Sequence, residues 1–283
     1  MSTFPSGGVI AVVVLSLFLH ASWNTLAKAI KDKVVAFGLI AATEAACGGV
    51  VLAVARAPSG AAWAFLVASV GVHVVYDVAL MNSYRFGDLA QTYPLARGLA
   101  PLLVAAGAFI GSGEAPTARQ LLGLAVVCGG LVGLVKLGGG GGSDRRAIGF
   151  ALLTGVAIAL YTVVDGLGAR RSGSPLGYGA ALFLLQGVAF LAVLALARGR
   201  SIPRRMDGRW WLGCVGGLLS VSAYMMVLWA QTRAALVSVS ALRETGVVVA
   251  AILGTVFLHE GHGRGRVAAA AVVAVGVALV VVA

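Results

Sequence analysis

Polar side chains that could bind a solute or carry a proton lie inside long apolar stretches of this sequence. Many of them are four positions apart, a spacing that places two side chains on one helix face. The pairs are His20 with Asn24, His73 with Asp77, Tyr93 with Arg97, and Tyr161 with Asp165. An ionisable side chain at membrane depth costs about 2.5 to 3.5 kcal/mol, so it normally faces the interior of a helix bundle. Each pair therefore marks a candidate site.

Two buried guanidinium groups, Arg97 and Arg243, suit a carboxylate or phosphonate group because guanidinium pairs bidentately with planar oxyanions. An amine on the same solute would meet an acid such as Asp165 or Asp77. Two alternatives stay open. Both arginines could instead pair with Asp77, Glu244 or backbone carbonyls and only hold helices together. The site could also take a quaternary or lipophilic cation through cation–π contact with tyrosines, neutralised by Glu44.

Carboxyl groups at membrane depth can exchange protons because desolvation favours their neutral form. We expect any proton coupling to use such groups. The candidates are Glu44, His73, Asp77 and Glu244.

Ten apolar stretches must position these side chains. Hydrophobic residues make up 60% of the 283 positions and charged residues 11%, and the mean hydropathy is +0.98. A stretch of about 20 apolar residues crosses the hydrocarbon core of a bilayer as a helix. The sequence predicts an all-α integral membrane protein with spans at 8–27, 34–55, 62–82, 89–110, 120–137, 147–167, 176–197, 210–231, 235–258 and 265–283.

The basic residues predict the orientation of these spans. Most of the 21 Lys and Arg residues, including Lys31, Arg145 and Arg204, fall in odd-numbered connections. The positive-inside rule places those connections in the cytoplasm and both termini outside. This distribution also accounts for the net charge of +11 without nucleic acid, since the basic residues are not interleaved with aromatic platforms.

Matched positions in the two halves predict an internal repeat. Tyr76 and Tyr224, like Gly98 and Gly246, are 148 positions apart, and other polar pairs recur at a similar separation. We expect a first five-helix unit at 1–137, a Gly-rich linker at 138–146 and a second unit at 147–283. An odd number of spans per unit inverts the second unit, an arrangement found in many secondary transporters.

Other classes of protein fit the sequence poorly. Cys47, Cys128 and Cys214 are isolated, so no disulfide framework or metal site is expected. The run GGGGGSD lacks the lysine of a phosphate-binding loop, and no cofactor is expected. No Ser–His arrangement or repeated metal-ligand pattern supports an intramembrane enzyme, and no ring of charges or carbonyl filter supports a channel.

Four segments carry a resemblance to a known family: HASWNTLAK at 20–28, YRFGDLAQTYPLARGLAP at 84–101, YTVVDGLGARRSG at 161–173 and LRETGVVVAAILGTVFLHE at 242–260. Together they resemble EamA-type transporters of the drug/metabolite transporter superfamily. The resemblance implies two inverted five-helix repeats around a central cavity in the bacterial inner membrane. Members of this family usually have cytoplasmic termini, whereas the loop charges here predict the reverse.

The resemblance also implies which residues line the cavity. They are His20, Trp23, Asn24, Tyr76, Tyr93, Arg97, Tyr161, Asp165, Tyr224 and Arg243. The segment Tyr93 to Gly98 resembles a subgroup associated with phosphonate utilisation. We therefore expect a secondary active transporter that moves an amino-acid-like or organophosphonate-like solute by alternating access, either coupled to protons or by exchange. The alternatives are an exporter of quaternary ammonium or lipophilic cations and, more remotely, an intramembrane enzyme.

Overall fold

The computed structural model describes residues 5–87, 92, 95–97, 100–137, 144–198, 210–246 and 264–281. The described residues form α-helices and one short 3₁₀ helix. The helices are α1 (Gly7–Ala29), α2 (Lys33–Val54), η1 (Gly60–Ala62), α3 (Trp63–Phe86), α5 (Ala100–Ser112), α6 (Ala118–Leu137), α7 (Arg145–Arg171), α8 (Pro175–Arg198), α9 (Trp210–Gln231), α10 (Leu236–Glu244) and α12 (Arg264–Val281).

These helices follow the expected apolar stretches closely. Six of the described helices are long and apolar enough to cross a membrane, namely α1, α2, α3, α7, α8 and α9. Shorter helices occupy the described parts of the other four stretches, namely α5, α6, α10 and α12. The rest of the ninth predicted span, after residue 246, lies outside the described residues, as does the Gly-rich run at 138–143.

Local capping signals set several helix boundaries. The Asp32 carboxylate accepts hydrogen bonds from the amides of Val34 and Val35 at the start of α2, and the Asp144 side chain accepts from the Arg146 amide at the start of α7. Such side chains satisfy the free N–H groups of a first helical turn. Pro175 opens α8, where a missing N–H costs nothing.

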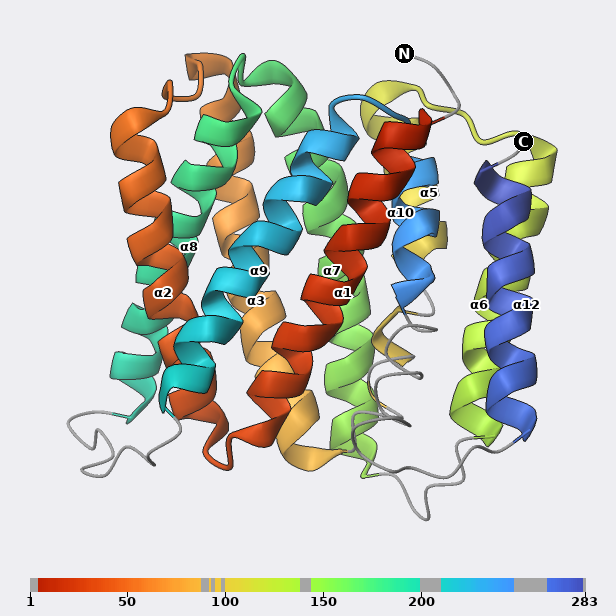
Figure 1. Ribbon diagram of the computed structural model, residues 1–283, viewed down its shortest axis with the longest axis horizontal. Coiled ribbons are helices and arrows are strands. Elements are labelled where there is room, and N and C mark those ends of the chain that lie inside the picture. Colours follow the sequence, from red (N-terminus) through yellow and green to blue (C-terminus); the bar gives the residue numbers. More distant parts are fainter. Residues whose placement is uncertain are drawn as a thin grey trace.

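The helices pack as a bundle in which each close pair joins one half of the chain to the other. The pairs are α1 with α9, α2 with α8, α3 with α7, α5 with α10, and α6 with α12. In Figure 1 these helices stand roughly side by side, and α1 begins and α12 ends at the upper end of the view. The outward faces are apolar, for example at Val54, Ile110 and Leu196, which are each more than four-fifths exposed. Exposed side chains of this kind suit contact with lipid.

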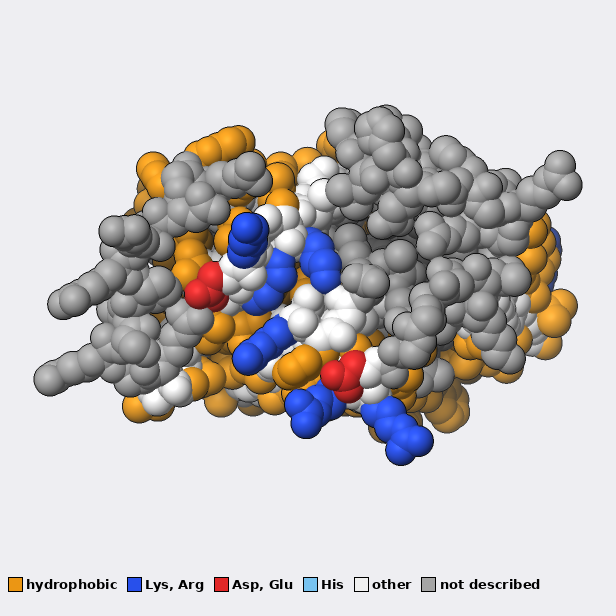
Figure 2. Space-filling model, turned by 90° about the horizontal axis from the view of Figure 1, so that it is seen from below, with side chains coloured by type: hydrophobic (Ala, Val, Ile, Leu, Met, Phe, Trp, Pro, Cys, Tyr) orange, Lys and Arg blue, Asp and Glu red, His pale blue; other side chains and the backbone are white. Residues whose placement is uncertain are grey.

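Basic side chains gather at the lower end of the bundle. Lys28 Nζ donates to the carbonyl oxygens of Tyr84 at 3.0 Å and Gly87 at 2.8 Å, which joins the end of α1 to the end of α3. The guanidinium groups of Arg85 and Arg146 lie 5.4 and 5.8 Å from the centre of the Phe86 ring. Figure 2 shows this end, with Lys and Arg side chains over its central part. The end of α1, the end of α3 and the start of α7 thus lie at the same end of the bundle, as we expect if the ten predicted spans alternate in direction.

An ion pair joins helices of both halves elsewhere in the bundle. Arg170 at the end of α7 contacts Glu114 at 2.5 Å and donates to the carbonyl oxygens of Gln231 and Ala234. The other oxygen of Glu114 accepts from the Leu236 amide at the start of α10.

Two glycines allow α2 and α8 to approach closely. A Cβ atom at Gly48 would lie 2.5 Å from Leu184 N and 2.6 Å from Ala180 O, and one at Gly187 would lie 2.5 Å from Ala41 O. The backbones of the two helices therefore meet directly, as small residues permit in membrane helices. This contact fixes the separation of α2 and α8, which both contribute to the site.

Gly48→Ala is expected to lower the free energy of unfolding by about 1–3 kcal/mol, because the added methyl group meets backbone atoms that cannot move aside. Gly49→Ala is the matched control, since its Cβ would lie 3.8 Å from the flexible end of Leu184. Unfolding in mixed detergent–SDS micelles measures both. Equal stability of the two variants would contradict the close contact.

Candidate functional site

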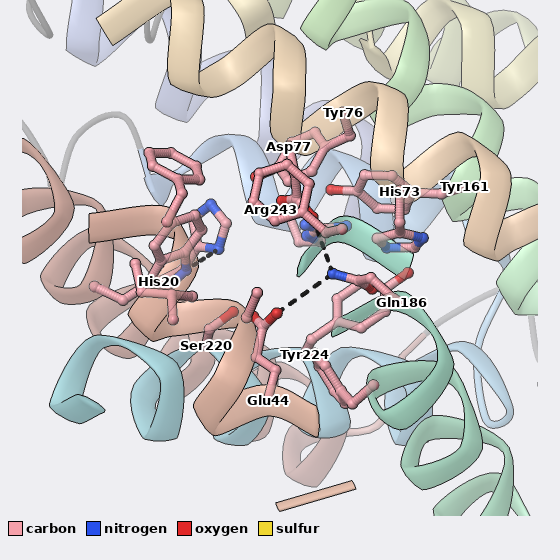
Figure 3. Close-up of a pocket in the computed structure, with 16 residues that line it drawn as sticks. His20, Glu44, His73, Tyr76, Asp77, Tyr161, Gln186, Ser220, Tyr224 and Arg243 are labelled. Atoms are coloured by element: carbon pink, nitrogen blue, oxygen red, sulfur yellow. Dashed lines mark hydrogen bonds between the residues drawn. The ribbon is translucent and has the colours of Figure 1, made fainter. Parts of the chain in front are cut away.

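A pocket lies in the interior of the bundle, between helices of the two halves. Seven helices line it: α1, α2, α3, α7, α8, α9 and α10. The lining residues are His20, Trp23, Phe37, Ile40, Ala41, Glu44, His73, Tyr76, Asp77, Tyr161, Phe183, Gln186, Phe190, Ser220, Tyr224 and Arg243. Figure 3 shows the labelled polar side chains converging on one space. The pocket thus brings together six of the ten residues expected to bind substrate and three of the four expected to carry protons.

An acidic pair contributes to the lining of this pocket. Glu44 comes from α2 and Asp77 from α3, and the side-chain amide of Gln186 from α8 lies between them. Gln186 Nε2 donates to Glu44 Oε2 at 3.4 Å and to Asp77 Oδ2 at 3.3 Å. All three side chains are at least nine-tenths buried. Two acidic groups held by one amide form a subsite for positive charge or for a proton.

Arg243 supplies positive charge to the same pocket. It belongs to α10, is 4% exposed, and its guanidinium carbon lies 5.9 Å from the centre of the Tyr224 ring. Within the part of the chain that the structure describes, no carboxylate oxygen lies within 4 Å of its guanidinium group. A buried guanidinium group without a carboxylate partner is suited to an anionic ligand group.

His20 adds a hydrogen-bond donor to the lining. The indole N–H of Trp23 donates to His20 Nδ1 at 3.1 Å, and the two rings meet edge to face with centroids 5.3 Å apart. Because an indole nitrogen can only donate, His20 Nδ1 must accept, and the neutral ring then carries its hydrogen on Nε2. The sequence predicted both residues in the site, and Trp23 orients the ring of His20.

Four ring side chains form a continuous aromatic wall: His73, Tyr76, Tyr161 and Tyr224. His73 stacks on Tyr161 with centroids 4.3 Å apart, and Tyr76 and Tyr224 each meet Tyr161 edge to face, at 5.4 and 5.6 Å. Aromatic faces attract cations and pack against apolar groups. The wall is therefore suited to contact with either a cation or an apolar group.

The remaining predicted residues that the structure describes are buried but do not line the pocket. Arg97 Nη1 pairs with Glu244 at 3.2 Å and donates to the Arg243 carbonyl oxygen at 3.3 Å. Arg97 thus matches the alternative in which a buried arginine pairs with an acidic side chain and a backbone carbonyl, whereas the Arg243 side chain lines the pocket. Asn24 donates to the His20 carbonyl oxygen at 2.8 Å and accepts from the Tyr84 hydroxyl at 2.5 Å.

Asp165 is also enclosed. It is fully buried and accepts hydrogen bonds from the hydroxyls of Tyr178 at 2.9 Å and Tyr224 at 2.5 Å, with His73 Nε2 3.9 Å away. Tyr224 and His73 line the pocket, so Asp165 positions two members of the wall from behind. Tyr93 lies outside the described residues. Direct substrate contact by Asn24, Arg97, Asp165 and Tyr93 stays a prediction.

Sequence reasoning missed Gln186 and Ser220 because it searched apolar stretches for ionisable and aromatic side chains. A single amide in the middle of an otherwise apolar span was the available signal for Gln186. Within the described residues, no group of three or more His, Cys, Asp or Glu side chains could hold a metal ion.

Known proteins resemble this chain in sequence and in fold. Residues 145–282 match the model of the EamA-like transporter family. The second half of the chain is therefore similar to this family, in keeping with the resemblance of its segments at 161–173 and 242–260, and the apolar helices indicate a multi-pass membrane protein. A solved crystal structure, described only as a protein, superposes with a TM-score of 0.73 at 19% identity, covering 96% of this chain and 94% of its own. That similarity shows the fold alone. No curated protein matches the sequence significantly.

Proposed function

We propose that this protein is a secondary active transporter of a small amino-acid-like or organophosphonate-like solute. One observation carries the proposal: a buried pocket holds Arg243, which has no carboxylate partner among the described residues, together with the acidic pair Glu44 and Asp77. A solute with an acidic group and an amine complements both, because each buried charge then gains a partner. The aromatic wall encloses the carbon skeleton between them.

Movement of this solute is proposed to follow alternating access between two inverted repeats, 1–137 and 147–283, joined by the linker 138–146. The packing supports this division. In two such repeats, α1 is the equivalent of α7 and α3 is the equivalent of α9. A contact of α1 with α9 then requires an equivalent contact of α7 with α3, and both contacts are present. Two other contacts, of α2 with α8 and of α6 with α12, each join equivalent helices of the two repeats. A pocket between such units can open to either side by their relative rotation.

Transport is tested most simply with purified protein in liposomes. We expect saturable uptake of radiolabelled L-alanine or 2-aminoethylphosphonate above protein-free liposomes. Coupling to protons through Glu44, His73, Asp77 or Glu244 predicts that an imposed pH gradient drives accumulation, whereas pure exchange requires solute inside. Uptake of neither compound would contradict the proposed substrate class, and uptake unaffected by a pH gradient would exclude proton coupling.

The second candidate function is export of quaternary ammonium or lipophilic cations. The aromatic wall beside two carboxyl groups favours it. It predicts that tetraphenylphosphonium binds more tightly than any acidic solute and that Arg243 is dispensable. An intramembrane enzyme remains the distant alternative and predicts chemical change of a bound lipid.

The location proposed is the bacterial inner membrane with both termini outside. The basic lower end in Figure 2, opposite the start of α1 and the end of α12, supports this orientation through the positive-inside rule. A C-terminal alkaline phosphatase fusion is then expected to be active and a C-terminal green fluorescent protein fusion to be dark. A fluorescent fusion would reverse the orientation.

A further inference from the structure

One polar atom of a side chain that lines this pocket has no hydrogen-bond partner in the part of the protein that the structure describes. Gln186 Oε1 is buried and accepts no hydrogen bond in the described part of the protein, although Nε2 of the same amide donates to two carboxyl groups. Two other buried side-chain oxygens share this condition, Gln231 Oε1 and Glu244 Oε2. Of the three residues, Gln186 alone lines the pocket.

The neighbours of Gln186 determine how its amide is oriented. Glu44 and Asp77 each present a carboxyl oxygen to it, and Gln186 Nε2 donates to both, so the NH₂ group points toward them. The carbonyl oxygen is then directed elsewhere, and rotation of the amide would bring three acceptor oxygens together. A buried acceptor left without a donor costs free energy, which a ligand N–H could recover.

We infer that Gln186 makes this site selective for primary ammonium groups over N-methylated ones. The inference rests on the proposed function and deepens it. A primary ammonium carries three N–H donors, enough for Gln186 Oε1, Glu44 and Asp77 together. A trimethylammonium group carries none, so it can use charge and the aromatic wall but leaves Gln186 Oε1 unpaired. Gln186 thereby favours amino acids and aminophosphonates and disfavours their betaine counterparts.

The test compares matched compounds by isothermal titration of the full-length protein in nanodiscs. The probes are L-alanine and 2-aminoethylphosphonate, each with its N,N,N-trimethyl derivative. Wild-type protein is expected to bind at least one primary amine about tenfold or more tightly than its trimethyl form, as one hydrogen bond to a charged group implies. Gln186→Met, which keeps a similar side-chain volume but lacks the carbonyl oxygen, is expected to reduce this ratio to near one.

Gln231→Met is the matched control. It removes a second buried amide whose carbonyl oxygen is also unpaired and which does not line the pocket, so the ratio is expected to stay at the wild-type value. Unfolding temperatures without ligand show whether both variants are folded. Binding of the trimethyl compounds to Gln186→Met also shows whether Glu44 and Asp77 keep their positions. Displacement of these carboxyl groups would weaken binding of the trimethyl compounds as well.

Each outcome separates the two proposals. Equal binding of primary and trimethyl forms by wild-type protein would overturn the role of Gln186 and leave the transport function standing. A wild-type preference that Gln186→Met retains would do the same. Binding of none of the four compounds would overturn the proposed substrate class and this inference with it.

Discussion

Arg243→Met is expected to weaken binding of L-alanine and 2-aminoethylphosphonate by about 30-fold or more. The guanidinium group is buried in the pocket with no carboxylate within 4 Å in the described residues, so the ligand's acid group is its natural partner. Removing one member of a buried, hydrogen-bonded charge pair costs about 2–5 kcal/mol, which corresponds to a loss of this size or greater. Isothermal titration in nanodiscs measures it.

The same change is expected to leave the free energy of unfolding equal or slightly higher. A buried charge without a partner destabilises the empty protein, and methionine fills a similar volume without that cost. The backbone carbonyl of Arg243, which accepts from Arg97, is retained in the variant. Wild-type affinity for both compounds in folded Arg243→Met would contradict the oxyanion subsite and favour the cation exporter.

Arg97→Met is expected to produce the opposite pattern, a large loss of stability. Arg97 pairs with Glu244 at 3.2 Å where both side chains are almost completely buried. Breaking a buried pair from one side costs about 3–5 kcal/mol because the other charge is left uncompensated. Unfolding in mixed detergent–SDS micelles measures the loss.

The double variant Arg97→Met with Glu244→Leu is the control, since it removes both charges and is expected to restore much of the lost stability. If Arg97→Met were as stable as wild type but failed to bind solute, Arg97 would belong to the binding site, as the sequence analysis predicted. The two arginines looked equivalent in the sequence. We expect replacement of Arg243 to weaken solute binding and replacement of Arg97 to lower the free energy of unfolding.

Hydropathy was sufficient to predict most of the fold. The stretches around α1, α2, α3, α7, α8 and α9 are long and apolar, so their helices were found to within a few residues. The spans predicted at 89–110 and 235–258 are described only in part, and α10 begins one residue after the predicted start of its span. The cost of burying ionisable groups also selected Glu44, His73, Asp77 and Arg243, which the pocket brings together.

The sequence could not show which side chain each buried polar residue would contact. Arg97 and Arg243 sit on different helices, and whether each meets Glu244 or the pocket depends on how α10 packs against its neighbours. Asp165 looked free to bind an amine, but Tyr178, near the start of α8, reaches across to it. An uncharged side chain such as Gln186 gains its importance only from the two carboxyl groups on either side.

Sided labelling of a cysteine in the pocket tests the central claim that these groups surround a chamber reached in turn from both membrane faces. The variant is Ser220→Cys in a background where Cys47, Cys128 and Cys214 are replaced by serine or alanine, with Val277→Cys as a buried control outside the pocket. The account predicts that a membrane-impermeant maleimide labels position 220 from either side of oriented vesicles, that solute slows the labelling, and that position 277 stays unlabelled. Protection of position 220 from both sides would contradict the account.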